Sequence, residues 1–219
     1  MSLDATSIPA NLRRANVTLI VDAMPQLGLD VRKFVMETGI GPLSLPEGRT
    51  VIGRALTTGW EVGRGRMTAE SVDRYIYGPL DAASPGSVWV VAGGTGELYS
   101  LFGDIIAMAC RRNGMGGAVT DNGCRDIAAI RAMGFPVFAR GAVPYGPGDA
   151  IRPVSVNEEI VCGGVLVQPG DLVAADIDGV IVIPGKTIDE LDKAVAERAA
   201  VEDESRRKIE GGRSLTDSH

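Results

Sequence analysis

The sequence predicts an α/β fold that combines parallel crossover units with a strand-rich segment and a long charged helix. Apolar strand patterns alternate with helical patterns between residues 87 and 140, as in strand–helix–strand crossovers. Residues 151–183 contain short β-branched runs separated by turn residues, and residues 188–210 form one charged helical stretch. At 219 residues the chain suits a single domain.

The first part of the chain follows periodicity and turn signals. In chain order, the expected elements are a helical region at 9–28 ended by Gly28, a strand at 49–58, a short helix at 69–77 before a break at Pro79, a buried strand entering the glycine turn 93–96, a helix at 97–112 stopped by Asn113-Gly114, a strand at 116–121, a helix at 125–133 and a strand at 136–140.

The second part is expected to be a strand meander or a sandwich-like layer that packs on the α/β part. Its turns are predicted at residues 157–158, 169–171 and 178–179. One helix should then run from Ile188 to about Glu210. The predicted organisation is therefore an α/β domain at residues 1–187 followed by a helical arm and tail at 188–219.

Composition excludes several classes of function. The net charge of −6 and the pI near 4.9 disfavour sequence-independent nucleic-acid binding, which depends on Lys and Arg. A local basic pocket for an anionic substrate stays compatible with this charge. No apolar run reaches the roughly 20 residues of a membrane helix, and the first residues lack a secretory pattern. We therefore expect a cytoplasmic protein with no nucleic-acid or membrane partner.

Histidine and cysteine usage narrows the chemistry further. His219 is the only histidine, which argues against Ser-His-Asp and Cys-His sites and against histidine-ligated zinc. Cys110, Cys124 and Cys162 show no CxxC spacing and are expected to be buried, small apolar residues; Cys124 is the one to watch because it precedes Arg125. Proton transfer must then rely on carboxylates, Lys, Tyr, Cys or metal-bound water.

The segment Asp121-Asn122-Gly123-Cys124-Arg125-Asp126 follows a predicted strand and precedes a predicted helix. In parallel α/β folds ligands gather at this edge of the sheet. Asp126 offers a hard oxygen to Mg²⁺ or Mn²⁺, and Arg125 offers a planar fork that grips a carboxylate. The alternative is a helix cap with a surface arginine.

Asp104 lies 20 residues before Arg125, within a stretch expected to be an apolar helix, where a charge needs a reason. The alternative is an exposed helical position beside a kink at Gly103. The glycine turn 93–96 could present N–H groups to an anion, and it faintly resembles a methyltransferase loop although it lacks the third glycine.

The combination Asp104-x20-Arg125-Asp126 resembles the signature of the class II pyruvate aldolases in the RraA-like family, the 4-hydroxy-4-methyl-2-oxoglutarate and 4-carboxy-4-hydroxy-2-oxoadipate aldolases. The segments VDAMPQLGL, PVFARG and QPGDLVAADIDGVIVIP are similar as well, and the resemblance covers about residues 10–210. Family members that regulate ribonuclease E share Arg-Asp but are expected to lack the first Asp. The segment RRANVTLIVDAM departs from the expected Ser/Thr-rich form, which leaves the substrate open.

The resemblance implies a swivelling α/β/β sandwich of RraA-like type, assembled as a homotrimer or a homohexamer. Active sites would lie between subunits, with the C-terminal helix reaching toward a neighbour. Glu202 corresponds best to the glutamate that the family contributes in trans, with Glu197, Asp203 and Glu204 as rivals. The alternative for Glu202 is an ordinary solvated carboxylate on a helix.

The resemblance also implies an activity: metal-dependent cleavage of a 4-hydroxy-2-oxo acid to pyruvate plus a second oxo acid, with oxaloacetate decarboxylation on the side. Asp126, largely with water, would hold Mg²⁺ or Mn²⁺, and Arg125 would bind the pyruvyl part and stabilise its enolate. Asp104 would orient a water that takes the C4 hydroxyl proton. Gly103 and the backbone N–H groups of Ile105 and Ile106 would help to bind the substrate carboxylate.

This activity needs no Schiff-base lysine, and Lys186 and Lys193 are interpreted as surface residues. The alternative function is a non-catalytic regulator of RraA type that binds a protein partner such as ribonuclease E.

Overall fold

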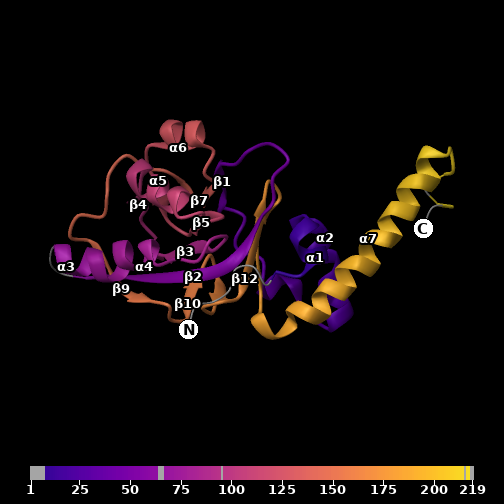
Figure 1. The fold of residues 1–219 in the computed structure, drawn as a ribbon, viewed down its shortest axis with the longest axis horizontal. Coiled ribbons are helices and arrows are strands. Elements are labelled where there is room, and N and C mark those ends of the chain that lie inside the picture. The colour runs from indigo at the N-terminus through magenta and orange to yellow at the C-terminus, as the bar shows by residue number, and fades with distance from the viewer. Residues whose placement is uncertain (1–7, 64–66, 95, 215, 218–219) are drawn as a thin grey trace.

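The computed structural model describes residues 8–63, 67–94, 96–214 and 216–217. Its main element is a mixed sheet organised around the long strand β2 (Val51–Val62), which pairs in parallel with β3 on one side and antiparallel with β12 on the other (Figure 1). The order across the sheet is β1 (Gly41–Ser44), β7 (Val137–Ala139), β5 (Gly117–Thr120), β3 (Val88–Ala92), β2, β12 (Leu172–Asp176) and β13 (Gly179–Ile183), with β9 (Ile151–Val156) also paired to β2.

Two smaller sheets complete the strands. A hairpin is formed by β10 (Ile160–Cys162) and β11 (Val165–Val167). A three-stranded parallel sheet is formed by β4 (Ser100–Phe102), β6 (Gly123–Cys124) and β8 (Gly141–Ala142). Because β4, β6 and β8 follow β3, β5 and β7 along the chain, this small sheet extends the parallel strands at their carboxyl ends.

The helices lie in two groups. The first group consists of helices from the beginning and the end of the sequence: α1 (Ala10–Arg14), α2 (Val17–Ala23) and α7 (Ile188–Glu210). It also includes 3₁₀ turns at Met24–Leu27, Val31–Lys33 and Gly185–Thr187. The second group lies among the parallel strands: α3 (Ala69–Val72), a π-helical turn (Asp73–Tyr77), α4 (Gly78–Asp81), α5 (Asp104–Arg112) and α6 (Ile127–Met133). Figure 1 shows the two groups on opposite sides of β12.

Alternation along the strands builds three apolar layers. In β3, Trp89 and Val91 face the helices α5 and α6, whereas Val88 and Val90 face the hairpin β10–β11 and part of β12. In β12, Leu172 and Ala174 face the other way, onto α1, α2 and α7. The sheet is therefore covered on both faces, as its mostly apolar strands require.

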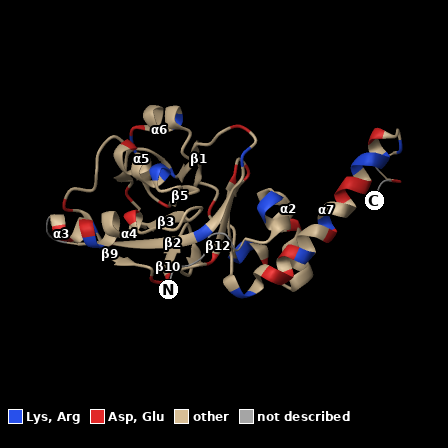
Figure 2. Cartoon of the chain, in the orientation of Figure 1, with Lys and Arg blue, Asp and Glu red and all other residues tan. Residues whose placement is uncertain are grey.

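The helix α7 is packed for only part of its length. Ile188, Leu191, Ala194 and Val195 are buried against α1 and α2, but Val201 and Ile209 are about half exposed. The later turns project away from the sheet, and charged side chains follow the helix throughout (Figures 1 and 2). No helix in the described ranges is long and apolar enough to cross a membrane.

The structure confirms most of the expected elements, including the helix at Ile188–Glu210 and the turns between β9 and β13. Two expectations are wrong. The stretch 97–112 is not one helix: β4 occupies Ser100–Phe102, and the helix begins at Asp104. Helical structure also passes through Pro79, because the proline sits in the first turn of α4, where its missing N–H costs nothing.

The second half of the chain combines both expected arrangements. The strands β12 and β13 join the main sheet, while β10–β11 form a separate layer. The division into residues 1–187 and 188–219 stays a prediction, and His219 lies outside the described residues.

Candidate active site

Two neighbouring strand ends bring Asp104 close to the Arg125-Asp126 pair. Strands β4 and β6 are parallel, with Phe102 opposite Cys124, and each continues directly into a helix. The backbone N–H of Asp104 donates to Oδ2 of Asp126 at 3.4 Å. The prediction that a 20-residue crossover places these residues at one edge of the sheet is therefore confirmed.

Asp126 has an uncommon backbone conformation. Its φ of 60° and ψ of 32° are left-handed, a region that non-glycine residues rarely occupy and that often marks functional sites. It precedes α6 but makes no side-chain cap bond to that helix. Its Oδ2 instead lies 3.4 Å from Nε of Arg125 and accepts the Asp104 N–H. The helix-cap alternative thus lacks the hydrogen bond that defines a cap.

Gly103 permits this close approach. A Cβ atom on Gly103 would lie 2.3 Å from Oδ2 of Asp126 and 3.0 Å from Cγ of Arg125. Any side chain at this position would displace one or both of these groups. Gly103 therefore matters because it leaves room for these two side chains. It does not kink a helix, since it lies before the first residue of α5.

The first turn of α5 presents backbone donors to the same place. The N–H groups of Ile105 and Ile106 have no partner within the helix, as is general for a first turn, and Gly103 has no side chain to cap them. The helix dipole adds a partial positive charge here. Asp104 is thus the first residue of the helix. The expectation that its charge lies inside an apolar helix is wrong.

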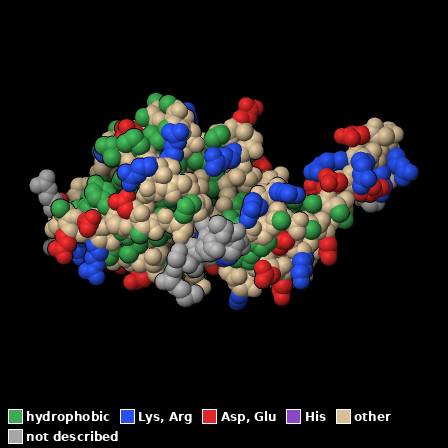
Figure 3. Space-filling model, viewed as in Figure 1, with side chains coloured by type: hydrophobic (Ala, Val, Ile, Leu, Met, Phe, Trp, Pro, Cys, Tyr) green, Lys and Arg blue, Asp and Glu red, His purple; other side chains and the backbone are tan. Residues whose placement is uncertain are grey.

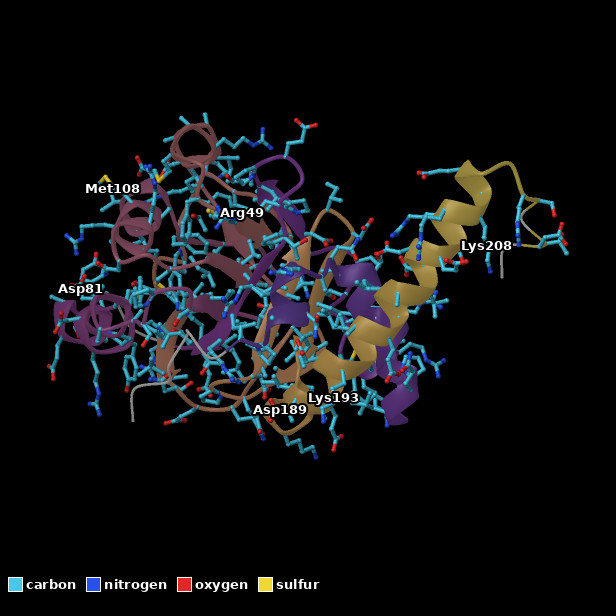
Figure 4. The ribbon with its side chains drawn as sticks, turned by 45° about the vertical axis from the view of Figure 1, so that its right-hand side comes forward. Arg49, Asp81, Met108, Asp189, Lys193 and Lys208 are labelled. Atoms are coloured by element: carbon cyan, nitrogen blue, oxygen red, sulfur yellow. The ribbon has the colours of Figure 1, made fainter. Side chains whose placement is uncertain are left out.

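These groups line one end of a cavity of about 350 Å³. The polar end consists of the turn Gly103–Ile106 together with Arg125. The remaining walls are mainly apolar and include Trp60, Met67, Val72, Ile76, Leu101 and Phe102. Apolar side chains gather on the surface formed by α3, α4 and α5 (Figure 3), and Met108 of α5 points outward from it (Figure 4).

The π-helical turn Asp73–Tyr77 shapes one of these walls. It carries Ile76, which is buried, and Tyr77, which is about half exposed, into the cavity lining. Such turns inside helices are frequent at functional sites because they redirect side chains. Trp60 of β2 also lines the cavity; it is buried, and its Nε1 is covered without a hydrogen-bond partner among the described residues.

Two buried polar residues that were not predicted to have a role connect the segments beside β4 and β6 by hydrogen bonds. Asp121 accepts hydrogen bonds from the N–H groups of Gly93 at 2.7 Å and Gly163 at 3.3 Å, and burial raises the pKa of its carboxyl. Asn122 accepts from the N–H of Tyr99 and donates to the carbonyl of Gly93 at 3.2 Å. The N–H of Gly93 is thus engaged internally, which removes it from the expected anion-binding glycine turn, whose Thr95 lies outside the described residues.

The other nucleophiles do not contribute to this cavity. All three cysteines are buried, as expected, and burial raises the pKa of the Cys124 thiol to about 12, so it stays protonated at neutral pH. Lys186 and Lys193 are exposed, and Lys193 lies on α7 (Figure 4).

Glu202 does not lie at this site within one chain. It sits on the projecting part of α7, where its carboxylate pairs with Arg206 at 2.7 Å and with Arg198 at 3.5 Å. Figure 1 places this part of α7 on the opposite side of the molecule from α5 and α6. Its role in trans, and the rival roles of Glu197, Asp203 and Glu204, stay predictions.

The donor set at this edge fits a hard divalent cation held mainly by water. Within the described ranges no group of three or more His, Cys, Asp or Glu side chains could enclose a metal ion. Asp126 is nevertheless 42% exposed at its side chain, and its Oδ1 carries no hydrogen bond from a described residue. Mg²⁺ commonly uses one or two carboxylates and keeps several waters, which this single oxygen ligand suits.

Comparisons with known proteins identify a matching family and similar sequences. The family described as "RraA-like: Aldolase/RraA" matches residues 17–182. A protein of Halalkalibacterium halodurans named "Putative 4-hydroxy-4-methyl-2-oxoglutarate aldolase" is 37% identical over 127 residues, which cover 58% of this chain and 59% of that protein. The chain thus spans little more than half the length of that relative.

Solved structures show the same fold. Streptomyces coelicolor RraAS2, described as an unusual member of the RNase ES inhibitor RraA protein family, has a TM-score of 0.79 and 27% identity, covering 94% of this chain and 99% of that one. An uncharacterized protein from Pseudomonas syringae pv. tomato has a TM-score of 0.82 and 24% identity, covering 98% and 93%. The swivelling α/β/β sandwich with a C-terminal helix, expected from the sequence, is confirmed.

Proposed function

The chain belongs to the RraA-like family, and from this premise we propose that it is a divalent-metal-dependent lyase that cleaves a 4-hydroxy-2-oxo acid to pyruvate and a second oxo acid. The observation that supports this most directly is the shared cavity end. There Asp104, Arg125 and the first-turn N–H groups of α5 meet around one small space. A carboxylate, a guanidinium and free backbone donors together suit a 2-oxo acid.

Arg125 is suited to bind the pyruvyl part of the substrate. Only its Nε faces Asp126, and its two terminal nitrogens donate no hydrogen bond to a described residue. Its side chain is 51% exposed and lines the cavity. A guanidinium with free terminal nitrogens can grip a carboxylate with two bonds and stabilise an oxygen as negative charge develops on it. The N–H groups of Ile105 and Ile106 would add donors to the same anion.

Asp104 is suited to proton transfer. Its carboxylate would orient a water that takes the proton of the C4 hydroxyl, so that C4 becomes a carbonyl as the C3–C4 bond breaks. The electron pair of that bond passes to C3 and forms the enolate of pyruvate, which then gains a proton to give the methyl group. The same enolate is formed when oxaloacetate loses its C4 carboxylate as CO₂.

Asp126 would hold Mg²⁺ or Mn²⁺, which when bound supplies a Lewis acid that polarises the 2-oxo group. The chain contributes the rest of this arrangement: Gly103 leaves room for the carboxylate, and Arg125 and the Asp104 N–H orient its Oδ2. Fixing a ligand by such hydrogen bonds is typical of metal sites.

The experiment that tests the proposal is pyruvate release from 4-hydroxy-2-oxo acids and from oxaloacetate, before and after treatment with EDTA. We expect activity to disappear with the chelator and to return with Mg²⁺ or Mn²⁺, because the available ligands are oxygens. Decarboxylation of oxaloacetate at the full rate by the metal-free protein, above the solution background, would refute the mechanism.

Assembly is part of the same proposal. The later turns of α7 project from the domain and leave Val201 and Ile209 about half exposed, which supports a homotrimer or a homohexamer in which Glu202 acts in a neighbouring site. We expect light scattering at micromolar concentration to give a multiple of the 22.9 kDa chain mass. If the measured mass is that of one chain, the proposed oligomer and the proposed role of Glu202 in trans are both wrong.

A regulator of RraA type is the second candidate, and the likeness to RraAS2 favours it. Such a protein would bind a partner such as ribonuclease E and would not need a carboxylate at position 104. If the metal-bound protein releases no pyruvate from any 4-hydroxy-2-oxo acid or from oxaloacetate, the regulator replaces the lyase as the proposed function.

A further inference from the structure

Strand β4 has one residue more than the part of β6 with which it pairs. Ser100 lies opposite Gly123 and Phe102 lies opposite Cys124, so Leu101 is an extra residue on the β4 side. Such a bulge bends its strand and redirects the chain that follows, and bulges are frequent beside active sites. The segment directly after this bulge begins α5 and carries the carboxylate proposed to act in proton transfer. The bulge therefore sets where that carboxylate lies relative to β6.

The side chain of Ser100 holds the bulge closed. Its Oγ donates a hydrogen bond to the carbonyl oxygen of Phe102 at 2.9 Å, across the extra residue. The same carbonyl oxygen accepts the backbone N–H of Arg125 at 3.2 Å. A carbonyl oxygen has two lone pairs, and these two bonds use both of them. Ser100, which is buried and lines the cavity, thus fixes a carbonyl that in turn holds the backbone of Arg125.

Asn122 holds the beginning of the same pair of strands. It is buried, and its Oδ1 accepts the N–H of Tyr99, directly before β4, and the N–H of Gly123, the first residue of β6. Its Nδ2 donates to the carbonyl of Gly93, directly after β3, at 3.2 Å. This one side chain therefore ties the beginnings of β4 and β6 to each other and to the main sheet. With Asn122 at its start and Ser100 across its bulge, β4 has little freedom to shift along β6.

We infer that Ser100 and Asn122 are positioning residues, which fix the bulge in β4 and so hold Asp104 in place for aldol cleavage. This inference rests on the proposed function. Both side chains act through the backbone of β4 and β6, and neither needs to touch the substrate. The bond from the Asp104 N–H to Asp126 is long, at 3.4 Å, so a small shift of β4 would break it.

Loss of this support should affect two reactions differently. The bulge lies in β4, which leads into Asp104, whereas Arg125 follows β6, which is also paired with β8. Asp104 is therefore expected to move more than Arg125. In the proposed mechanism aldol cleavage needs Asp104, and oxaloacetate decarboxylation does not. The ratio of the two rates thus reports the position of Asp104, while a general loss of stability would lower both rates together.

The direct test compares Ser100→Thr with Ser100→Val. The two side chains have nearly the same shape and both suit a strand, but only threonine keeps the hydroxyl. Any cost of the added methyl group is shared, so the difference between the variants reports the hydrogen bond to Phe102. We expect the ratio of aldol cleavage to decarboxylation to be at least about 10-fold lower in Ser100→Val, because a misplacement of about 1 Å can cost about 100-fold. Equal ratios in the two folded variants would overturn the inference.

Asn122→Ala provides the same test from the other end of β4. It should lower the ratio of the two rates by a similar factor. Asn113→Ala is the matched control, because Asn113 also donates its side-chain amide to a backbone carbonyl, that of Leu80 at 3.0 Å, but at the far end of α5. If Asn122→Ala keeps the wild-type ratio, or if Asn113→Ala lowers it equally, the inference is wrong.

Hydrogen exchange separates the inference from the proposed function. The N–H of Arg125 should exchange at least about 10-fold faster in Ser100→Val than in Ser100→Thr, because its acceptor carbonyl is no longer held. Mass spectrometry of a peptide covering residues 123–128 measures this, with a peptide from β3 as the internal control. If the wild type is active but the ratio and the exchange are equal in both variants, the inference is wrong and the proposed function stands. If the exchange differs but the wild type cleaves no 4-hydroxy-2-oxo acid, the bulge is held as inferred and the proposed function is wrong.

Discussion

The two ends of the cavity are built in different ways. At the polar end the backbone dominates: Gly103 leaves room, Asp126 is held in a left-handed conformation, and the first turn of α5 offers N–H groups. At the apolar end side chains dominate, and they come from β2 and from the irregular helical stretch that contains Ile76. Substitutions should therefore act differently at the two ends.

The contrast suggests a division of work. A backbone-built end accepts few changes, which suits chemistry common to all substrates. A wall of side chains can vary in size and charge without altering the strand ends that carry Arg125 and Asp126. We expect the polar end to control whether the enolate forms, and the apolar end to control which substrate reaches it.

The largest effect is expected for Asp104→Ala. Loss of general acid–base assistance should reduce aldol cleavage by about 10²–10⁴-fold. Oxaloacetate decarboxylation removes no hydroxyl proton and should fall less, and pyruvate binding should change little. The two rates should be measured in the same variant after its fold and oligomeric state are checked. Equal, small losses in both reactions would mean that Asp104 is only structural.

Arg125→Lys should follow, with a loss of roughly 10²–10³-fold in kcat/KM for every substrate, since lysine keeps the charge but not the two-bond grip. Arg111→Lys is the matched control because Arg111 is exposed on α5 outside the cavity lining. If Arg125→Lys slowed one substrate and spared another, the claim that the polar end serves all substrates alike would be wrong.

Gly103→Ala should weaken metal binding by about 10–100-fold, the usual effect of disturbing the groups that orient a ligand. The new methyl group would meet Oδ2 of Asp126, an atom at the end of a side chain, so the fold should survive. Gly141→Ala is the control, because its Cβ would make only an ordinary contact with Leu98. Titration with Mn²⁺ would measure both, and unchanged affinity in Gly103→Ala would argue against Asp126 as the ligand.

The smallest effect is expected for Trp60→Phe. The change removes a buried N–H without a described partner, which offsets part of the lost ring contact, so stability should change by only about 1 kcal/mol. Pyruvate release should stay within about 3-fold of the wild type, below the 10–100-fold effects seen when the groups that orient a metal ligand are changed. Thermal unfolding and the rate of pyruvate release measure the two quantities. A larger loss of pyruvate release at unchanged stability would show that the indole ring takes part in substrate binding.

The polar end could be predicted from the sequence to a large extent. The spacing between Asp104 and Arg125 corresponds to one strand–helix–strand crossover, and such a unit places both at the same edge. The reason given for Asp104 was nevertheless wrong, because apolar residues in the short strand β4 fit a helical period as well as a strand one. The roles of Asp126 and Gly103 depend on a left-handed backbone and on a contact that no pattern encodes.

The apolar end and the supporting residues could not be predicted. Trp60, Val72 and Ile76 belong to separate elements, and only the tertiary structure shows that they line one cavity. Asp121 ends a predicted strand, which was a usable signal, but its bond to Gly163 joins segments far apart in the sequence. No sequence pattern encodes how α7 would lie relative to a neighbouring chain.

The placement of β2 has a consequence for synthesis. Its partner on one edge, β12, pairs Leu172 with Arg54 and Ala175 with Val51, so this edge is completed only when the last quarter of the chain is made. Until then a long apolar strand has unpaired backbone groups, the feature that drives edge-to-edge aggregation. Truncation before β12 should therefore cost solubility during expression, even though such a fragment would retain every residue of the cavity.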